Sequence, residues 1–168
     1  MCMRTMWIAV VLLGCAEGKD GDFADCDADG LSGIGQATVD GIEWTASDGT
    51  WMEAGSAVQI NFQSGIGISL NLRGTRSQAG AGVADSVAED AFPVVIDLSG
   101  VDGSGSVFDQ RHSPKSYASS QPGGEGSMSI LERDGSALIV CFDFDAVDAS
   151  GVIMTVRDGK GRVTNLQR

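Results

Sequence analysis

Proline, histidine and basic residues are scarce in this 168-residue chain, and these shortages exclude several classes of protein. It has 3 prolines, 1 histidine, and 11 lysines and arginines against 23 acids, which gives a formal net charge of −12. Nucleic-acid binding needs clustered basic residues to neutralise phosphates. The basic residues here are scattered, so nucleic acid is excluded as a partner. The single histidine, His112, has no G-x-S-x-G elbow near it, which is weak evidence for nucleophilic catalysis.

The apolar run at the start of the chain is too short to cross a bilayer. Met6–Leu13 has eight residues and follows Arg4, which is typical of a secretory signal peptide. The run ends in Leu-Leu-Gly-Cys at residues 12–15, and this motif resembles the lipobox of bacterial lipoproteins. The resemblance implies that residues 1–14 are a signal peptide and that Cys15 carries lipid. An ordinary secretory leader with a chance cysteine is the alternative.

Lipid on Cys15 would make a membrane the partner of the mature chain. Each buried methylene of an acyl chain contributes about 0.8 kcal/mol, so two or three chains hold a protein permanently. Ala16 follows the cysteine and favours the outer membrane by analogy with known sorting rules. The expected location is the bacterial cell envelope, facing the periplasm or the cell surface.

Cysteine is also scarce, with 4 in the chain. Cys2 leaves with the leader and Cys15 carries lipid, so Cys26 and Cys141 remain. Two cysteines in an oxidising compartment predict one disulfide. It would be worth on the order of 4–5 kcal/mol in the chain-entropy model. Two unpaired thiols are the alternative.

Residues 15–33 are rich in glycine and aspartate, which predicts a flexible acidic tether. Within the tether, Asp25, Asp27 and Asp29 alternate as they do at the start of an EF-hand calcium loop. However, Gln36 at position twelve cannot supply the bidentate carboxylate, and nearby glycines break the flanking helices. A solvated tether is therefore favoured, and a loose calcium loop is the alternative. Calcium is the only cofactor that the sequence suggests.

From residue 34 to residue 168 the apolar period becomes two, which is typical of strands with one buried face. Val58, Ile60 and Phe62 alternate with polar residues, and the following segment repeats the pattern. Asp-Gly pairs at residues 40–41 and 158–159 predict tight turns. No stretch has a sustained helical period. These signals together predict an all-β domain, an antiparallel sandwich or barrel of about nine or ten strands.

The strongest predicted strand surrounds Cys141. Its apolar side chains share one face, and Cys141, Asp143 and Asp145 share the other, where a returning N-terminal segment can reach the cysteine. With Asp148 nearby, these aspartates form a second acidic group. Paired catalytic or cation-binding carboxylates are one hypothesis. A solvent-facing polar row that discourages edge aggregation is favoured.

Four sequence motifs mark the two ends of the domain. They are "ATVDGIEWTA" at residues 37–46, and "GSMSI", "ALIVCFDFDAVDASG" and "IMTVRDGKG" between residues 126 and 161. Together they resemble an uncharacterised family of small β-rich bacterial lipoproteins. The resemblance implies a β fold and no catalytic residues.

Two loops at residues 74–91 and 111–124 are the expected working surfaces, because rigid sheets commonly present function on loops. The predicted function is a binding or structural module without catalytic residues. The alternative is a ligand- or carbohydrate-binding barrel, with Trp44, Trp51 and Tyr117 around an internal cavity. A calcium-dependent module or a hydrolase is less favoured.

Overall fold

All regular secondary structure in the described part of the chain is β-strand, and the computed structural model contains eleven strands. The structure describes residues 26, 31, 34–54, 57–73, 93–111, 113–134 and 136–166. The strands are β1 (Gly35–Val39), β2 (Ile42–Ala46), β3 (Asp48–Ala54), β4 (Ala57–Ser64), β5 (Ile66–Arg73), β6 (Val94–Asp97), β7 (Gly103–Asp109), β8 (Lys115–Ala118), β9 (Glu125–Asp134), β10 (Ala137–Val147) and β11 (Ile153–Asn165). The predicted all-β class is confirmed.

The strand count exceeds the nine or ten expected because sequence patterning misses short strands. β8 has four residues, of which only Tyr117 is buried, and it lies inside the stretch 111–124 that the sequence predicts as a loop. The prediction of a turn at Asp158-Gly159 is wrong, because β11 continues through both residues with an irregular register. A four-residue strand gives too few alternations for a period to be recognised.

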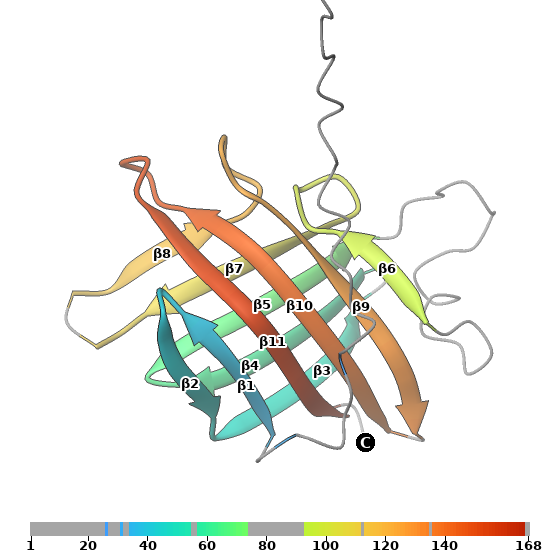
Figure 1. The fold of residues 1–168 in the computed structure, drawn as a ribbon. Helices are drawn as coiled ribbons and strands as arrows, with labels where there is room; N and C mark the ends of the chain where they lie inside the picture. The colour runs from blue at the N-terminus through green and yellow to red at the C-terminus, as the bar shows by residue number, and fades with distance from the viewer. Residues whose placement is uncertain are drawn as a thin grey trace, which may run out of the picture.

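Seven of the strands form a closed ring. Hydrogen-bonded neighbours run β11-β3-β4-β5-β7-β8-β10, and β10 pairs again with β11. Two links are short: β3 meets β11 in parallel through two residue pairs, and β8 meets β10 through one. Figure 1 shows the result as two crossing layers, with β1, β11, β10 and β9 in front of β3, β4, β5 and β7. The domain is therefore a flattened barrel, with features of both predicted architectures.

The first hairpin fixes the N-terminal strands on the C-terminal one. Asp40 and Gly41 have φ angles of 49° and 76°, which suits a two-residue type I′ turn. The predicted turn is confirmed. The Asp40 backbone N–H donates to the Thr155 carbonyl, and the Thr155 N–H donates to Asp40 Oδ1, both at 2.9 Å. These two bonds hold the β1–β2 turn against β11 in one register.

The apolar side chains of the alternating strands fill the space between the layers, as predicted. The inward residues of the three strongest strands are Val58, Ile60, Phe62, Ile66, Ile68, Leu70, Leu72, Leu138, Val140, Phe142, Phe144 and Ala146. Trp51 is fully buried and its Nε1 donates to the Ser136 carbonyl at 2.8 Å, while Trp44 Nε1 donates to Ser64 at 3.1 Å. Both indoles thus bury their rings and satisfy their one polar atom, as core tryptophans do.

Three phenylalanine rings at the centre of the barrel pack against glycine residues of the strands. The ring centroids of Phe62 and Phe142 are 5.5 Å apart, and those of Phe142 and Phe144 are 6.3 Å apart. A Cβ added to Gly105 would lie 2.8 Å from the Phe144 ring, and one added to Gly35 would lie 2.8 Å from the Phe62 ring. These strand glycines therefore make room for the aromatic core.

The Gly105→Ala substitution is expected to lower the free energy of unfolding by about 1–3 kcal/mol, because the new methyl group overlaps the Phe144 ring. Gly67→Ala on the neighbouring strand β5 is the matched control. Its Cβ would meet its nearest atom at 3.9 Å, so its stability should stay within about 0.5 kcal/mol of the original. Urea unfolding followed by tryptophan fluorescence measures both variants. Equal losses in the two would contradict the described packing.

Candidate functional site

The structure joins the two predicted disulfide cysteines. Cys26 and Cys141 are bonded, with their Cα atoms 6.4 Å apart and a sequence separation of 115. Cys141 pairs with Lys160 of β11 and Ser129 of β9, and its side chain lies outside the core cluster although it is only 1% exposed. The disulfide and the face of β10 are therefore both as predicted. The bond fastens residue 26 to the outer side of the front layer.

Several predicted site residues lie outside the described part of the chain. They are the lipidation residue Cys15, the calcium candidates Asp25, Asp27 and Asp29, the lone His112, and the loop at residues 74–91. The roles assigned to them from the sequence stay predictions.

Asp143 and Asp145 share the outer face of β10, as predicted, but each already has a bonding partner. Asp143 Oδ1 accepts the backbone N–H of Asp158 at 2.6 Å. Asp145 forms an ion pair with Arg157, which is only partly exposed. The two carboxylates therefore hold β10 to β11 across the front layer.

Asp148, the third member of the acidic group, belongs to the β10–β11 turn. Its Oδ1 accepts the backbone N–H groups of Ser150 and Val152 at 2.8 and 2.9 Å, a local bond pattern that favours aspartate in turns. Among the residues that the structure describes, no group of three or more His, Cys, Asp or Glu side chains is placed to hold a metal ion. The expectation that these acids protect a sheet edge is wrong, because β10 is paired with β9 and β11 and the acids are bonded within these strands and their turn.

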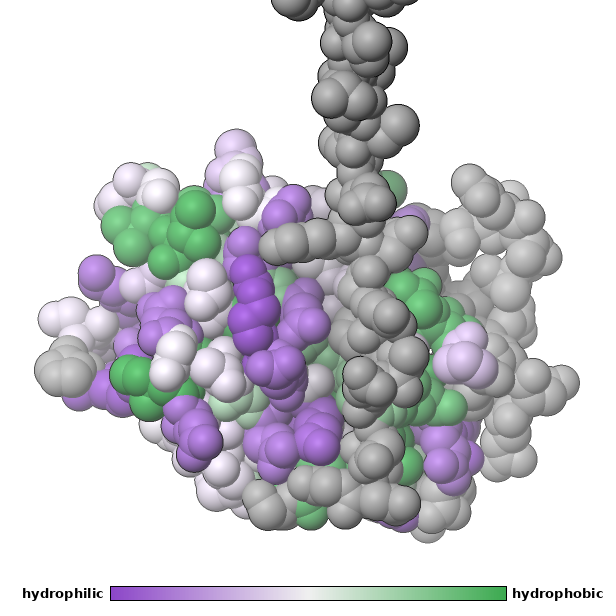
Figure 2. Space-filling model, in the orientation of Figure 1, coloured by the Kyte–Doolittle hydropathy of each residue, from purple (hydrophilic) through white to green (hydrophobic). Residues whose placement is uncertain are grey.

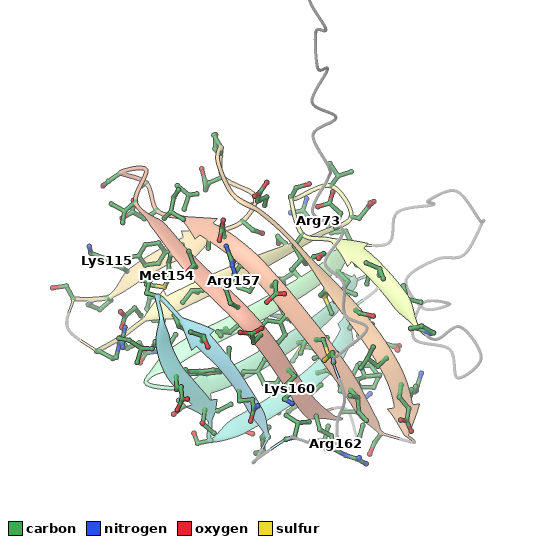
Figure 3. The ribbon with its side chains drawn as sticks, viewed as in Figure 1. Arg73, Lys115, Met154, Arg157, Lys160 and Arg162 are labelled. Carbon is green, nitrogen blue, oxygen red and sulfur yellow. A yellow bond between two sulfur atoms is a disulfide. The ribbon has the colours of Figure 1, made fainter. Side chains whose placement is uncertain are left out.

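A β-bulge in β11 positions Arg157 and Asp158 beside these carboxylates. Asp158 has a φ of 51°, and β11 contains one residue more than β10 at this point of the ladder. A bulge of this kind turns two successive side chains to the same face. Arg157 Nη1 donates to the carbonyls of Phe144 and Val156 at 3.0 and 2.9 Å. Figure 3 shows Arg157 on the front layer, with Lys160 further along β11.

Partial burial raises the pKa of Asp143 above that of an ordinary aspartate, because desolvation disfavours the charged form. The hydrogen bond from the Asp158 N–H and the charge of Arg157 lower this pKa, and the Asp158 carboxylate raises it, but burial is the largest effect. The ionised carboxylate therefore costs the folded state free energy. This cost is absent below the ordinary aspartate pKa of about 3.9 and is complete once the pH exceeds the folded-state pKa.

The aromatic residues considered as sugar platforms are in the core. Trp44, Trp51 and Tyr117 are all buried members of the main apolar cluster. A sugar platform needs an exposed ring face. The three residues therefore act as packing residues, and a carbohydrate-binding role for them is not supported.

Asp143→Asn is expected to raise the melting temperature at neutral pH. The amide has no charge to desolvate, and its Oδ1 still accepts the Asp158 N–H. The gain should shrink as the pH falls and vanish below about 3.9, where the original carboxyl is protonated in both states. Thermal unfolding by circular dichroism, from pH about 3 to about 7, measures the difference. A difference that stays constant across this range would contradict the assigned desolvation.

Cys26→Ser is expected to lower the free energy of unfolding by on the order of 4 kcal/mol, the chain-entropy value for so long a loop. The far-ultraviolet circular dichroism should stay that of a β protein, because Cys141 lies outside the main core. Denaturant titrations with and without a thiol reductant measure the loss. The reductant should weaken the original chain and leave the variant unchanged. Insensitivity of both to reductant would show that the disulfide does not form.

Comparison with known proteins finds no family model, curated protein or solved structure that matches this chain. No helix in the described ranges is long and apolar enough to span a bilayer.

Proposed function

We propose that this chain is a lipid-anchored protein of the bacterial cell envelope whose β domain serves as a binding or structural module. The observation that carries the proposal is the motif Leu12–Cys15, which follows Arg4 and an apolar core as in bacterial lipoproteins. Acyl chains on Cys15 tie such a chain to a membrane. Ala16 favours the outer membrane.

The disulfide supports a location outside the cytosol. Stable disulfides persist in oxidising compartments such as the periplasm and are rare where thioredoxin and glutathione keep thiols reduced. Cys26 and Cys141 are consumed by this bond. That pairing leaves Cys15 free for lipid, which is the assignment the leader motif implies.

The flattened barrel supports a module that presents a surface. Its interior holds a packed aromatic core, and the outer carboxylates of β10 are bonded within the sheet. A ligand-binding barrel with an internal cavity, the alternative function, would use Trp44, Trp51 and Tyr117 around that cavity, but these residues are part of the core. Binding through exposed turns is therefore favoured over binding inside the barrel.

Cys15→Ser is expected to abolish incorporation of radiolabelled palmitate and to remove the protein from the membrane fraction. Cys2→Ser is the matched control, because Cys2 lies within the proposed leader and should leave labelling unchanged. Metabolic labelling followed by fractionation and gel electrophoresis measures both. Full labelling of the Cys15→Ser chain would refute the anchor.

A further inference from the structure

Three turns that are far apart in sequence lie at one end of the barrel. They connect β6 to β7 (residues 98–102), β8 to β9 (residues 119–124) and β10 to β11 (residues 148–152). Figure 1 shows all three at the upper end of the molecule. These turns, with Ile153 beside them, are here called the turn end.

Close contacts join the three turns into one surface. A Cβ on Gly100, in the first turn, would lie 2.8 Å from the Cβ of Ser120 in the second. A Cβ on Gly123, in the second turn, would lie 4.0 Å from Val147, the last residue of β10 before the third turn. A ligand or surface that meets one turn therefore meets its neighbours.

The turn end exposes aliphatic side chains to solvent. Val101 is 72% exposed, Val152 is 50% exposed and Ile153 is 52% exposed. Figure 2 shows green beside the tip of the β10–β11 turn, purple and white over β10 and β11, and a second green area toward β6 and β9. Val152 and Ile153 are adjacent at the β10–β11 turn, and Val101 lies on the β6–β7 turn of the same end, so one flat surface can meet all three.

The charged residues at the turn end are mostly acidic. The turns contain Asp102 and Asp148 and no basic residue, and Asp148 is bonded within its own turn. Arg73 lies beside the first turn, where its Nη1 donates to the Gly100 carbonyl at 3.5 Å (Figure 3). Asp97 and Glu125 border the same turns, so these five charged residues carry a formal charge of −3. An acidic end of this kind suits zwitterionic rather than anionic lipid.

We infer that the turn end is a second, direct contact with the membrane, in which Val101, Val152 and Ile153 enter the lipid interface. This inference rests on the proposed function, because it takes the lipid anchor as the reason the domain meets a bilayer. Three aliphatic side chains are too few to hold a free protein on a membrane. An anchored domain meets the same bilayer at a high effective concentration, so a weak contact is sufficient to orient it.

The disulfide leaves the tether long enough for this contact. The eleven residues from Cys15 to Cys26 extend to roughly 36 Å at most. Cys141 lies six residues before Val147 on β10, which is roughly 20 Å along a strand. A lipid on Cys15 can therefore lie level with the turn end while residue 26 stays bonded to the front layer.

The test places a tryptophan at the turn end and measures its quenching by brominated lipid. A chain with a histidine tag in place of residues 1–15 keeps every described strand and binds vesicles of zwitterionic lipid doped with nickel-chelating lipid. Val152→Trp reports on the turn end. Phe108→Trp is the matched control, because Phe108 is also exposed but lies near the opposite end of β7. The native Trp44 and Trp51 are buried and provide a constant background.

The expected result is a loss of fluorescence in brominated vesicles for Val152→Trp and none for Phe108→Trp. Adding Val101→Asp to the Val152→Trp chain should restore the fluorescence, because a charge at this exposed position opposes entry into the interface. Equal signals for the two tryptophan variants would overturn the inference. A blue shift that appears without vesicles and grows with protein concentration would also overturn it, by assigning the turn end to a second copy of the chain.

The tagged chain separates this inference from the anchor. If palmitate labelling of Cys15 fails, the proposed function fails, whereas the quenching experiment still reports whether the turn end enters lipid. If labelling succeeds and quenching is absent, the anchor stands and the second contact is refuted.

Discussion

β11 is the strand on which both layers of the barrel depend. Its thirteen residues pair with β1 on one side and β10 on the other, and its last residues also meet β3 of the back layer. Without these links the layers would be open sheets with long unpaired edges, which invite association. The bulge at Asp158 bends the strand and increases its twist, as bulges do, and this suits a strand that leaves one layer to meet the other.

The strands follow from the sequence, but the way the barrel closes does not. Two-residue alternation predicts β4, β5 and β10 with the correct inward faces, because side chains of a strand must alternate between core and solvent. The ring, by contrast, depends on the single pair between Val147 and Ala118 and on the short parallel contact at Thr164. Such links join segments far apart in sequence and have no local pattern. The Asp158-Gly159 pair gives a correct signal for a left-handed residue, but that geometry serves a bulge as well as a turn.

Some features of the candidate sites could likewise be predicted from the sequence, and others could not. The disulfide could be predicted because parity placed Cys141 outside the core and only one partner remained for it. The bonding partners of Asp143 and Asp145 could not be predicted, because both carboxylates bond to residues of β11, whose register depends on the bulge. The turn end is also invisible in the sequence. Val101 and Val152 are single apolar residues in separate turns, which is common on protein surfaces, and only the folded chain places both turns at one end of the barrel.

The position of the disulfide also determines how the domain carries mechanical load. Cys141 is the fifth of eleven residues in β10, which is hydrogen-bonded to a neighbour on each side. A force applied at the N-terminal end of the chain is therefore transmitted through the disulfide to the middle of β10, which is paired on both sides. The segment between Cys26 and Gly35 carries none of this force. Reduction of the disulfide adds the nine residue steps from Cys26 to Gly35 to the tether, which lengthens it by up to roughly 30 Å. It also moves the force to β1, which with β2 can peel from β11 as a hairpin. The disulfide thus determines how far the domain can extend from its anchor and which strand resists a pulling force.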